Sequence, residues 1–181
     1  MTSALRTSLC AAAVLLFACG GGGLYGFARE YSPLSAERDH MEGSTEISYE
    51  EVRRDPVDFQ STTVAWFGVV TDLTIDESGA GTISMTYRTL AARNLCGDET
   101  SGSCRVTVSE REGGPFSATV QLRPEEQAGE DRLWRGSLVK IYGHPNGEFD
   151  EQGGPILVTD WHRHWPRGAY VTTGDRASMR R

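Results

Sequence analysis

This sequence of 181 residues contains a single lysine, Lys140. The 18 basic residues face 25 acidic ones, which gives a formal net charge of -7 at pH 7. A chain of this charge repels polyanions as a whole, and proteins that bind nucleic acids need a basic groove with stacking aromatic rings. We therefore expect no nucleic-acid partner.

Long apolar runs are also missing. The longest, residues 9–18, is well short of the roughly 20 residues that cross a bilayer as a helix. It follows a short polar start that contains Arg6, and it stops at Cys19. A charged start followed by a short apolar run is typical of a secretory signal peptide.

The end of this run, Leu16-Phe17-Ala18-Cys19, resembles the lipobox of bacterial lipoproteins. The resemblance implies that residues 1–18 are a cleaved signal peptide and that Cys19 carries fatty chains such as palmitate. Gly20 follows Cys19 without an acidic retention signal, which favours sorting to the outer membrane. The alternative is an ordinary signal peptide that is cut elsewhere, with Cys19 incidental. The polar residues that follow predict a lipidated flexible tether over 19–45.

Cysteines are few, and their positions fit an oxidising compartment. Of the four, Cys10 leaves with the signal peptide and Cys19 takes the lipid, so Cys96 and Cys104 remain as a pair. We expect them to form a disulfide that closes a local loop. Zinc binding by these two would need a second pair of ligands nearby, which the sequence does not offer.

The body of the chain contains little that predicts helix. Ser48 and Glu51 have the spacing of a capping box, so one short helix should begin there and end by Asp55, ahead of Pro56. A single helical turn is expected at 124–129. Segments rich in β-branched and aromatic residues predict strands over 62–73, 82–90, 104–109, 116–122, 137–143 and 155–161.

These segments predict a mostly β fold. We expect a small antiparallel OB-like barrel over residues 46–166, with one short N-terminal helix, followed by a polar C-terminal tail over 167–181. Gly68 should bend the first strand, and residues 113–115 should separate two others. The Arg-rich tail is short enough to be solvated, and it is a candidate for contact with anionic lipid headgroups.

The order of segments resembles the Slp (starvation-lipoprotein) family of bacterial outer-membrane lipoproteins over residues 47–166. The resemblance is carried by YEEVRRDPVDFQSTTVAWFGVV, TISMTYRTL, SLVKIYG and WHRHWP, and residues 93–104 look like an insertion. It implies an anchored, periplasm-facing OB-like domain, and it supplies no catalytic residue.

Three potential metal ligands alternate near the end of the last predicted strand. Asp160, His162 and His164 would share one face of a strand, with His144 nearby. A metal-dependent periplasmic hydrolase could use them. The interpretation that we prefer is a polar strand end at the barrel rim, with Trp161 and Trp165 packed inward.

The four tryptophans allow a further alternative, a glycan-binding OB module with an exposed aromatic groove. Trp66 and Trp161 are core candidates, whereas Trp134, between Arg132 and Arg135, is the candidate for an exposed contact.

The function that we expect is non-enzymatic, with no catalytic residue, metal or cofactor. The sequence indicates an outer-membrane lipoprotein whose periplasm-facing β domain has a structural role or binds another envelope component. Its predicted partners are the membrane, through the lipid anchor, and that envelope component; the sequence leaves its oligomeric state open.

Overall fold

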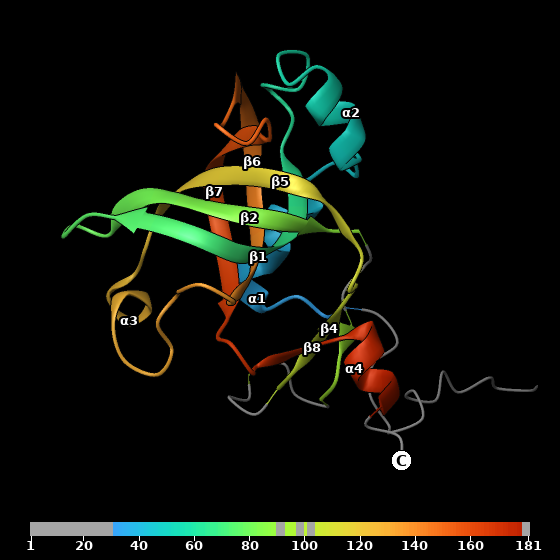
Figure 1. Cartoon of the computed structure of the whole chain (residues 1–181), viewed down its shortest axis with the longest axis vertical. Helices are drawn as coiled ribbons and strands as arrows, with labels where there is room; N and C mark the ends of the chain where they lie inside the picture. Colours follow the sequence, from blue (N-terminus) through green and yellow to red (C-terminus); the bar gives the residue numbers. More distant parts are fainter. Residues whose placement is uncertain (1–30, 90–92, 97–99, 101–103, 179–181) are drawn as a thin grey trace, which may run out of the picture.

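A closed β-barrel forms the centre of the molecule (Figure 1). The structure is a computed structural model, and it describes residues 31–89, 93–96, 100 and 104–178. The barrel strands are β1 (Val64–Ile75), β2 (Ala80–Arg88), β5 (Glu112–Gln121), β6 (Leu138–Phe149) and β7 (Pro155–Trp165). The prediction of a mostly β, small OB-like barrel is confirmed.

The strands follow the order β1-β2-β5-β7-β6, and β6 pairs with β1 to close the barrel. Neighbouring strands are antiparallel except β5 and β7, which run parallel. The helical turn expected after the third barrel strand is present as α3 (Pro124–Gln127). Residues 113–115, which we predicted as a separator, lie inside β5 instead. Their pairing with the end of β2 explains this, since Gly114 lies opposite Tyr87 and Pro115 opposite Thr86.

Side chains along β2 divide between the inside and the outside of the barrel, as their alternation predicts. Ile83 and Met85 are buried in the central core, whereas Thr82 and Ser84 occupy the outer face. Trp66 on β1 also belongs to this core, and its indole nitrogen donates a hydrogen bond to the carbonyl oxygen of Ile47 at 3.1 Å. The prediction of Trp66 as a core residue is therefore confirmed.

A second, three-stranded sheet packs against the outside of the barrel. It consists of β3 (Arg93–Asn94), β4 (Val106–Val108) and β8 (Tyr170–Thr172), in the order β3-β4-β8. Val106 and Val108 join Phe67, Leu138 and Trp165 in an apolar cluster of their own. The chain therefore has a second core, between the barrel and this small sheet.

The polar tail predicted over 167–181 is wrong for most of its length. Residues 170–172 form β8, which pairs in parallel with β4, and α4 (Thr173–Ser178) follows directly. Tyr170 packs against the second core, and its hydroxyl donates a hydrogen bond to the carbonyl oxygen of Gly136 at 3.0 Å. Apolar burial of the tyrosine ring outweighs the polar composition around it.

The flexible tether predicted over 19–45 is wrong in its second half. There the helix α1 (Ser35–Glu42) forms, and residues 31–42 lie across the outer face of β6 and β7. We call residues 31–42 the strap. Glu37, in its middle, is fully buried, because three cationic or hydroxyl groups of the barrel compensate its charge, as described below. A charged residue normally indicates solvent exposure, which explains the error.

Two local predictions are confirmed. The helix α2 (Tyr49–Arg54) begins after Ser48, whose hydroxyl accepts a hydrogen bond from the Glu51 amide at 3.2 Å, and the Glu51 carboxylate accepts one from the Ser48 amide at 3.0 Å. Cys96 and Cys104 form the expected disulfide, with their Cα atoms 5.1 Å apart.

Candidate functional site

A groove of about 520 Å³ lies on the outer face of β1, β2 and β5. Ser84 of β2 pairs with Ser117 of β5, so their hydroxyls share this face. The turn between β6 and β7 forms one wall. We call this the hydroxyl groove; its main residues are Thr82, Ser84, Ser117, Phe149, Asp150 and Glu151.

Asp150 shapes the wall of the hydroxyl groove. One carboxylate oxygen accepts hydrogen bonds from the amides of Gln152 and Gly154, both at 2.9 Å, which fixes the turn. The other accepts a hydrogen bond from the Ser117 hydroxyl at 2.6 Å, and that hydroxyl lies 3.3 Å from the hydroxyl of Ser84. Phe149, beside Asp150, leaves 49% of its surface exposed. The groove therefore presents the hydroxyls of Thr82 and Ser84, carboxylates and one exposed aromatic ring, whereas Ser117 is buried (3% exposed) and holds the Asp150 carboxylate.

The far end of the groove adjoins the loop that carries Trp134. Asp72 lines the groove and pairs with Arg135 at 2.7 Å, and the hydrogen bond from Arg135 holds the pKa of Asp72 below its ordinary value. Trp134 is 41% exposed, as predicted, and the guanidinium of Arg132 lies 4.2 Å from its ring centre. The exposed ring that lines the groove itself is Phe149.

The predicted set of Asp160, His162 and His164 does not come together. The β6–β7 register shifts between Tyr142 and Gly143, and Asp160 is the extra residue at that bulge. Its carboxylate lies 3.6 Å from the ring of His144, at the surface. A bulge interrupts the strict alternation on which the prediction depended.

The two remaining histidines face inward. His162 pairs with Ile141 and His164 with Val139, and both partners belong to the central core. Trp161 and Trp165 consequently face the outer side, so the prediction that they pack inward is wrong. The outer face can hold them because Trp165 lies in the second core and Trp161 stacks on His40 of the strap, with ring centres 5.5 Å apart.

Both histidines contact the fully buried carboxylate of Glu126 on α3. His162 Nε2 lies 3.1 Å from each oxygen, and His164 Nδ1 lies 3.0 Å from one of them. The other ring nitrogen of His164 lies 2.7 Å from the carbonyl oxygen of Asp131. The two ring nitrogens of His164 therefore both lie against oxygen atoms of the loop and helix that follow β5.

The charge on Glu126 is stabilised in spite of its burial. Burial by itself raises the pKa of this carboxyl, but hydrogen bonds from His162 and His164 outweigh it, and the pKa lies below its ordinary value. Arg123 adds its backbone amide at 2.8 Å and a side-chain ion pair. The histidines are thus held as partners of a buried carboxylate.

A second buried carboxylate, Glu37, attaches the strap to the barrel. Lys140 donates to it at 3.1 Å, the Tyr142 hydroxyl at 2.7 Å and Arg163 at 3.3 Å. Burial raises the pKa of Glu37, but the charge of Lys140 and the hydrogen bonds outweigh it, so the net direction is downward. The only lysine of the chain is therefore a structural partner in this network.

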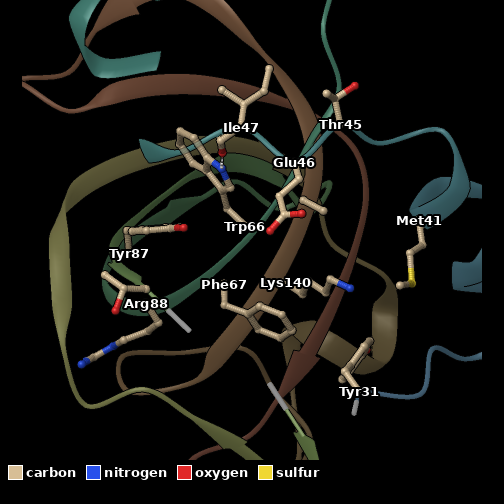
Figure 2. A pocket seen from close by; sticks show the side chains of 12 residues that line it. Tyr31, Met41, Thr45, Glu46, Ile47, Trp66, Phe67, Tyr87, Arg88 and Lys140 are labelled. Carbon is tan, nitrogen blue, oxygen red and sulfur yellow. Dashed lines mark hydrogen bonds between the residues drawn. The ribbon is translucent and has the colours of Figure 1, made fainter. Parts of the chain in front are cut away.

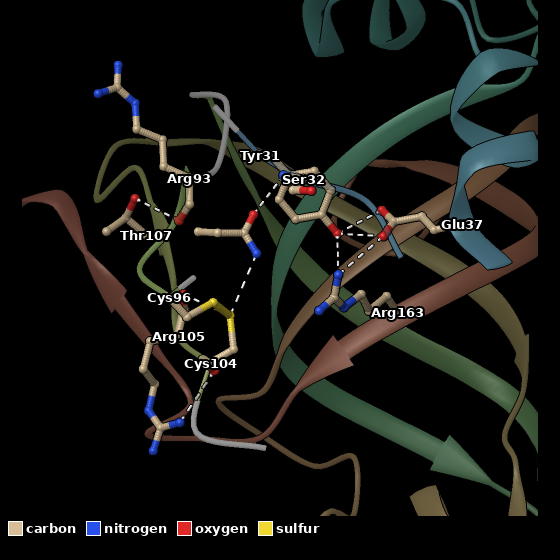
Figure 3. The surroundings of a disulfide bond; sticks show 10 residues. Tyr31, Ser32, Glu37, Arg93, Cys96, Cys104, Arg105, Thr107 and Arg163 are labelled. Atoms are coloured by element: carbon tan, nitrogen blue, oxygen red, sulfur yellow. Dashed lines mark hydrogen bonds and ion pairs between the residues drawn. A yellow bond between two sulfur atoms is a disulfide. The ribbon is translucent and has the colours of Figure 1, made fainter. Parts of the chain in front are cut away.

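Figure 3 shows how this network continues toward the disulfide. The Tyr31 hydroxyl donates to both oxygens of Glu37, at 2.8 and 2.7 Å. The next residue, Ser32, donates its amide to Asn94 at 2.7 Å, and the Asn94 amide group lies 3.7 Å from Cys104 Sγ. The start of the strap is thus fixed to the small sheet as well as to the barrel.

A smaller cavity, of about 300 Å³, lies between the segment after α1 and the strands β1 and β2. Figure 2 shows Glu46 pointing into it above Phe67 and the stem of Lys140, with Trp66 and Tyr87 on one side. Its walls are mostly side chains that already serve the core or the Glu37 network.

Within residues 31–89, 93–96, 100 and 104–178, no group of three or more His, Cys, Asp or Glu residues could hold a metal ion. Over the same residues, no helix has the length and apolarity needed to cross a membrane. The signal peptide over 1–18 and the lipidation site at Cys19 lie outside the described residues.

The sequence contained a partial signal for the two buried glutamates. Each is the third residue of its helix and accepts a hydrogen bond from the amide ahead of that helix, Leu34 for Glu37 at 3.1 Å and Arg123 for Glu126 at 2.8 Å. Neither has the preceding Ser or Thr of a complete capping box, so the pattern is weak. The hydroxyl groove was also missed, because its residues come from distant strands.

No protein-family model matches this chain, and no curated protein matches it.

Proposed function

We propose that this chain is a lipid-anchored bacterial envelope protein whose barrel is a non-enzymatic binding module. Residues 1–18 are the signal peptide, Cys19 carries the lipid, and the barrel faces the periplasm from the outer membrane. The module binds a hydroxyl-rich envelope component, a glycan strand, in the hydroxyl groove.

The observation that carries the binding proposal is the composition of the groove. OB-like barrels bind oligosaccharides and oligonucleotides on the face of their second and third strands, between the loops at its edges. Here those strands are β2 and β5, and the residues on that face are Thr82, Ser84 and Ser117. Hydroxyls and carboxylates offer hydrogen bonds to sugar hydroxyls, and an exposed ring offers a surface on which a sugar can stack.

Charge favours a glycan over a nucleic acid in this groove. Asp150 and Glu151 line it, and Asp72 at its end is paired with Arg135. A phosphate backbone would meet carboxylates here, whereas neutral sugars would not be repelled. The inward-facing histidines favour a non-enzymatic role, because His162 Nε2 and both ring nitrogens of His164 contact Glu126 or the Asp131 carbonyl oxygen.

Sedimentation with purified peptidoglycan tests the groove. We expect the lipid-free protein to sediment with it and Phe149→Ala to lower the retained fraction several-fold, because the stacking surface is lost. Val57→Ala is the matched control, since Val57 is an exposed apolar residue (58%) in the α2–β1 connection. The binding proposal fails if the wild-type protein is not retained, or if both variants lose retention equally.

Cys19→Ser tests the anchor separately. Wild-type protein made in a bacterial host should incorporate labelled palmitate and fractionate with the outer membrane, and the Ser variant should do neither. A Ser variant that still enters the membrane fraction, beside a wild type that takes up no palmitate, would contradict the anchor.

A further inference from the structure

Basic and acidic residues are unevenly distributed along this chain. Residues 89–111 and 167–181 together contain seven arginines and four acidic residues, whereas the rest of the sequence contains eleven basic and twenty-one acidic residues. Within these two segments, the residues that the structure describes contain five arginines and two acids, Glu110 and Asp175. Both counts give the two segments an excess of three positive charges, in a protein of net charge -7.

The residues of these two segments that the structure describes (89, 93–96, 100, 104–111 and 167–178) form one end of the molecule. They contain β3, β4 and β8, which make the small sheet, and α4 after it. We call this part the basic end. Arg93 on β3, Arg111 before β5 and Arg167 before β8 are exposed there. In Figure 1 the small sheet and α4 lie at the bottom of the view, along the longest axis of the molecule.

The strap enters the fold at this same end. Ser32 donates its amide to Asn94 of β3 at 2.7 Å, and Figure 3 shows this bond beside the disulfide. Tyr31 is the first described residue, and the buried carboxylate of Glu37 holds it. Any anchor on Cys19 is therefore connected to the protein at its basic end.

The connection is short because the strap is part of the fold. Only twelve peptide steps separate Cys19 from Tyr31, and even fully extended they span at most roughly 40 Å. A tether that continued to residue 45 would have allowed about twice that reach. The basic end therefore stays within roughly 40 Å of the surface that carries the lipid, about half the distance that the longer tether would allow.

We propose that the basic end is a docking surface for anionic lipid headgroups, which orients the anchored barrel on its membrane. The orientation on the membrane rests on the lipid anchor proposed above. The affinity of the basic end for anionic lipid is independent of that anchor. Arginines near an anionic bilayer are attracted to it within about one Debye length, roughly 10 Å at 0.1 M salt. The orange turn between β6 and β7, with Phe149, lies at the opposite end of the long axis in Figure 1. Docking of the basic end thus turns the Phe149 wall of the hydroxyl groove away from the lipid.

The test uses the chain from residue 20 onward, which retains every described residue and has no lipid. Its co-sedimentation is measured with vesicles of phosphatidylcholine alone and with vesicles that contain about 30% phosphatidylglycerol, at low and at high salt. We expect binding to the anionic vesicles only, and weaker binding as salt rises.

A charge-matched pair of variants locates the surface. Reversal of two exposed arginines at the basic end, Arg93→Glu and Arg167→Glu, should weaken vesicle binding at least tenfold. The control reverses two exposed arginines of α2, Arg53→Glu and Arg54→Glu, with the same change of net charge; in Figure 1, α2 lies at the end of the molecule opposite the small sheet. This control should weaken binding no more than about twofold, because a screened charge far from the surface contributes little. Circular dichroism checks that each variant is folded. If an Arg→Glu variant misfolds, the Arg→Gln variant at the same positions is used in its place.

Equal loss of binding in the two double variants, or wild-type binding that does not depend on lipid charge, would overturn the docking surface. Failure of the anchor would appear separately, as a Cys19 that takes up no palmitate while the vesicle result stands.

Discussion

Three successive residues of β7 connect the barrel to two buried carboxylates on opposite faces of the strand. His162 and His164 turn inward to Glu126, and Arg163 turns outward to Glu37. A buried carboxylate is costly unless cations and hydrogen bonds compensate it, and removal of one partner leaves the other uncompensated. These contacts therefore fix both α3 and the strap at residues 162–164 of β7.

The buried carboxylates should make stability fall at acid pH. The pKa of Glu126 in the folded protein is depressed, so its contribution is fully present above the unfolded pKa, about 4.3, and is lost as pH falls through the folded value. Glu126→Gln should destabilise the protein at neutral pH and flatten the fall in the free energy of unfolding between about pH 5 and pH 3. Urea titrations across this range measure both effects.

Glu125→Gln is the control for this experiment, because Glu125 is its exposed neighbour on α3. Its acid profile should match that of the wild type. Parallel profiles for all three proteins would show that Glu126 does not carry the acid sensitivity.

At the scale of the elements, the sequence pattern correctly predicted the helices and strands whose position depends on neighbouring residues. Ser48 and Glu51 cap α2 as their spacing indicates, and the alternation of Ile83 and Met85 places β2 correctly. The wrong predictions concern residues whose burial or orientation depends on contacts with residues far away in the sequence. Glu37 is polar in sequence, yet Lys140 and the other donors of the barrel bury it; similarly, the bulge at Asp160 depends on the β6–β7 register. For the same reason, the hydroxyl groove could not be assembled from separate strands before their pairing was known.

Gly68 provides a prediction about the packing of β1. A Cβ at this position would lie 2.7 Å from the ring of Phe116 and 2.9 Å from Met85 Cβ, so the strand needs glycine for close approach as well as for any bend. Gly68→Ala should lower the free energy of unfolding by about 1 to 3 kcal/mol, since the core must shift to admit the methyl group.

Gly43→Ala is the comparison, because its Cβ would meet only ordinary contacts, the nearest at 3.4 Å, and its φ is negative. This change should stay within about 0.5 kcal/mol of the wild type in urea unfolding. A Gly68 variant as stable as the Gly43 variant would refute the packing argument.

At the scale of the whole molecule, the folded domain includes the strap, so a stable chain must begin at or before Tyr31. A chain that starts at Tyr31 keeps the Glu37 network, whereas one that starts at Gly43 leaves Lys140 and Arg163 without their carboxylate and uncovers Trp161. We expect the shorter chain to lose about 3 kcal/mol or more of stability, because cations are left unpaired and apolar surface is exposed.

Urea midpoints of the two truncated chains measure this difference. The chain that starts at Tyr31 should unfold at the same midpoint as one that starts at residue 20. Coincident midpoints for all three would mean that the strap is only loosely attached.

The pairing of β1 with β6 also has a kinetic consequence. Val64 finds its partner in Gly143, and β8 reaches β4 only after almost the whole chain has been made. Topologies built from partners so distant in sequence fold slowly. We therefore expect the chain to stay unfolded while it emerges from the ribosome, which is the state that the proposed export through a secretion pore requires.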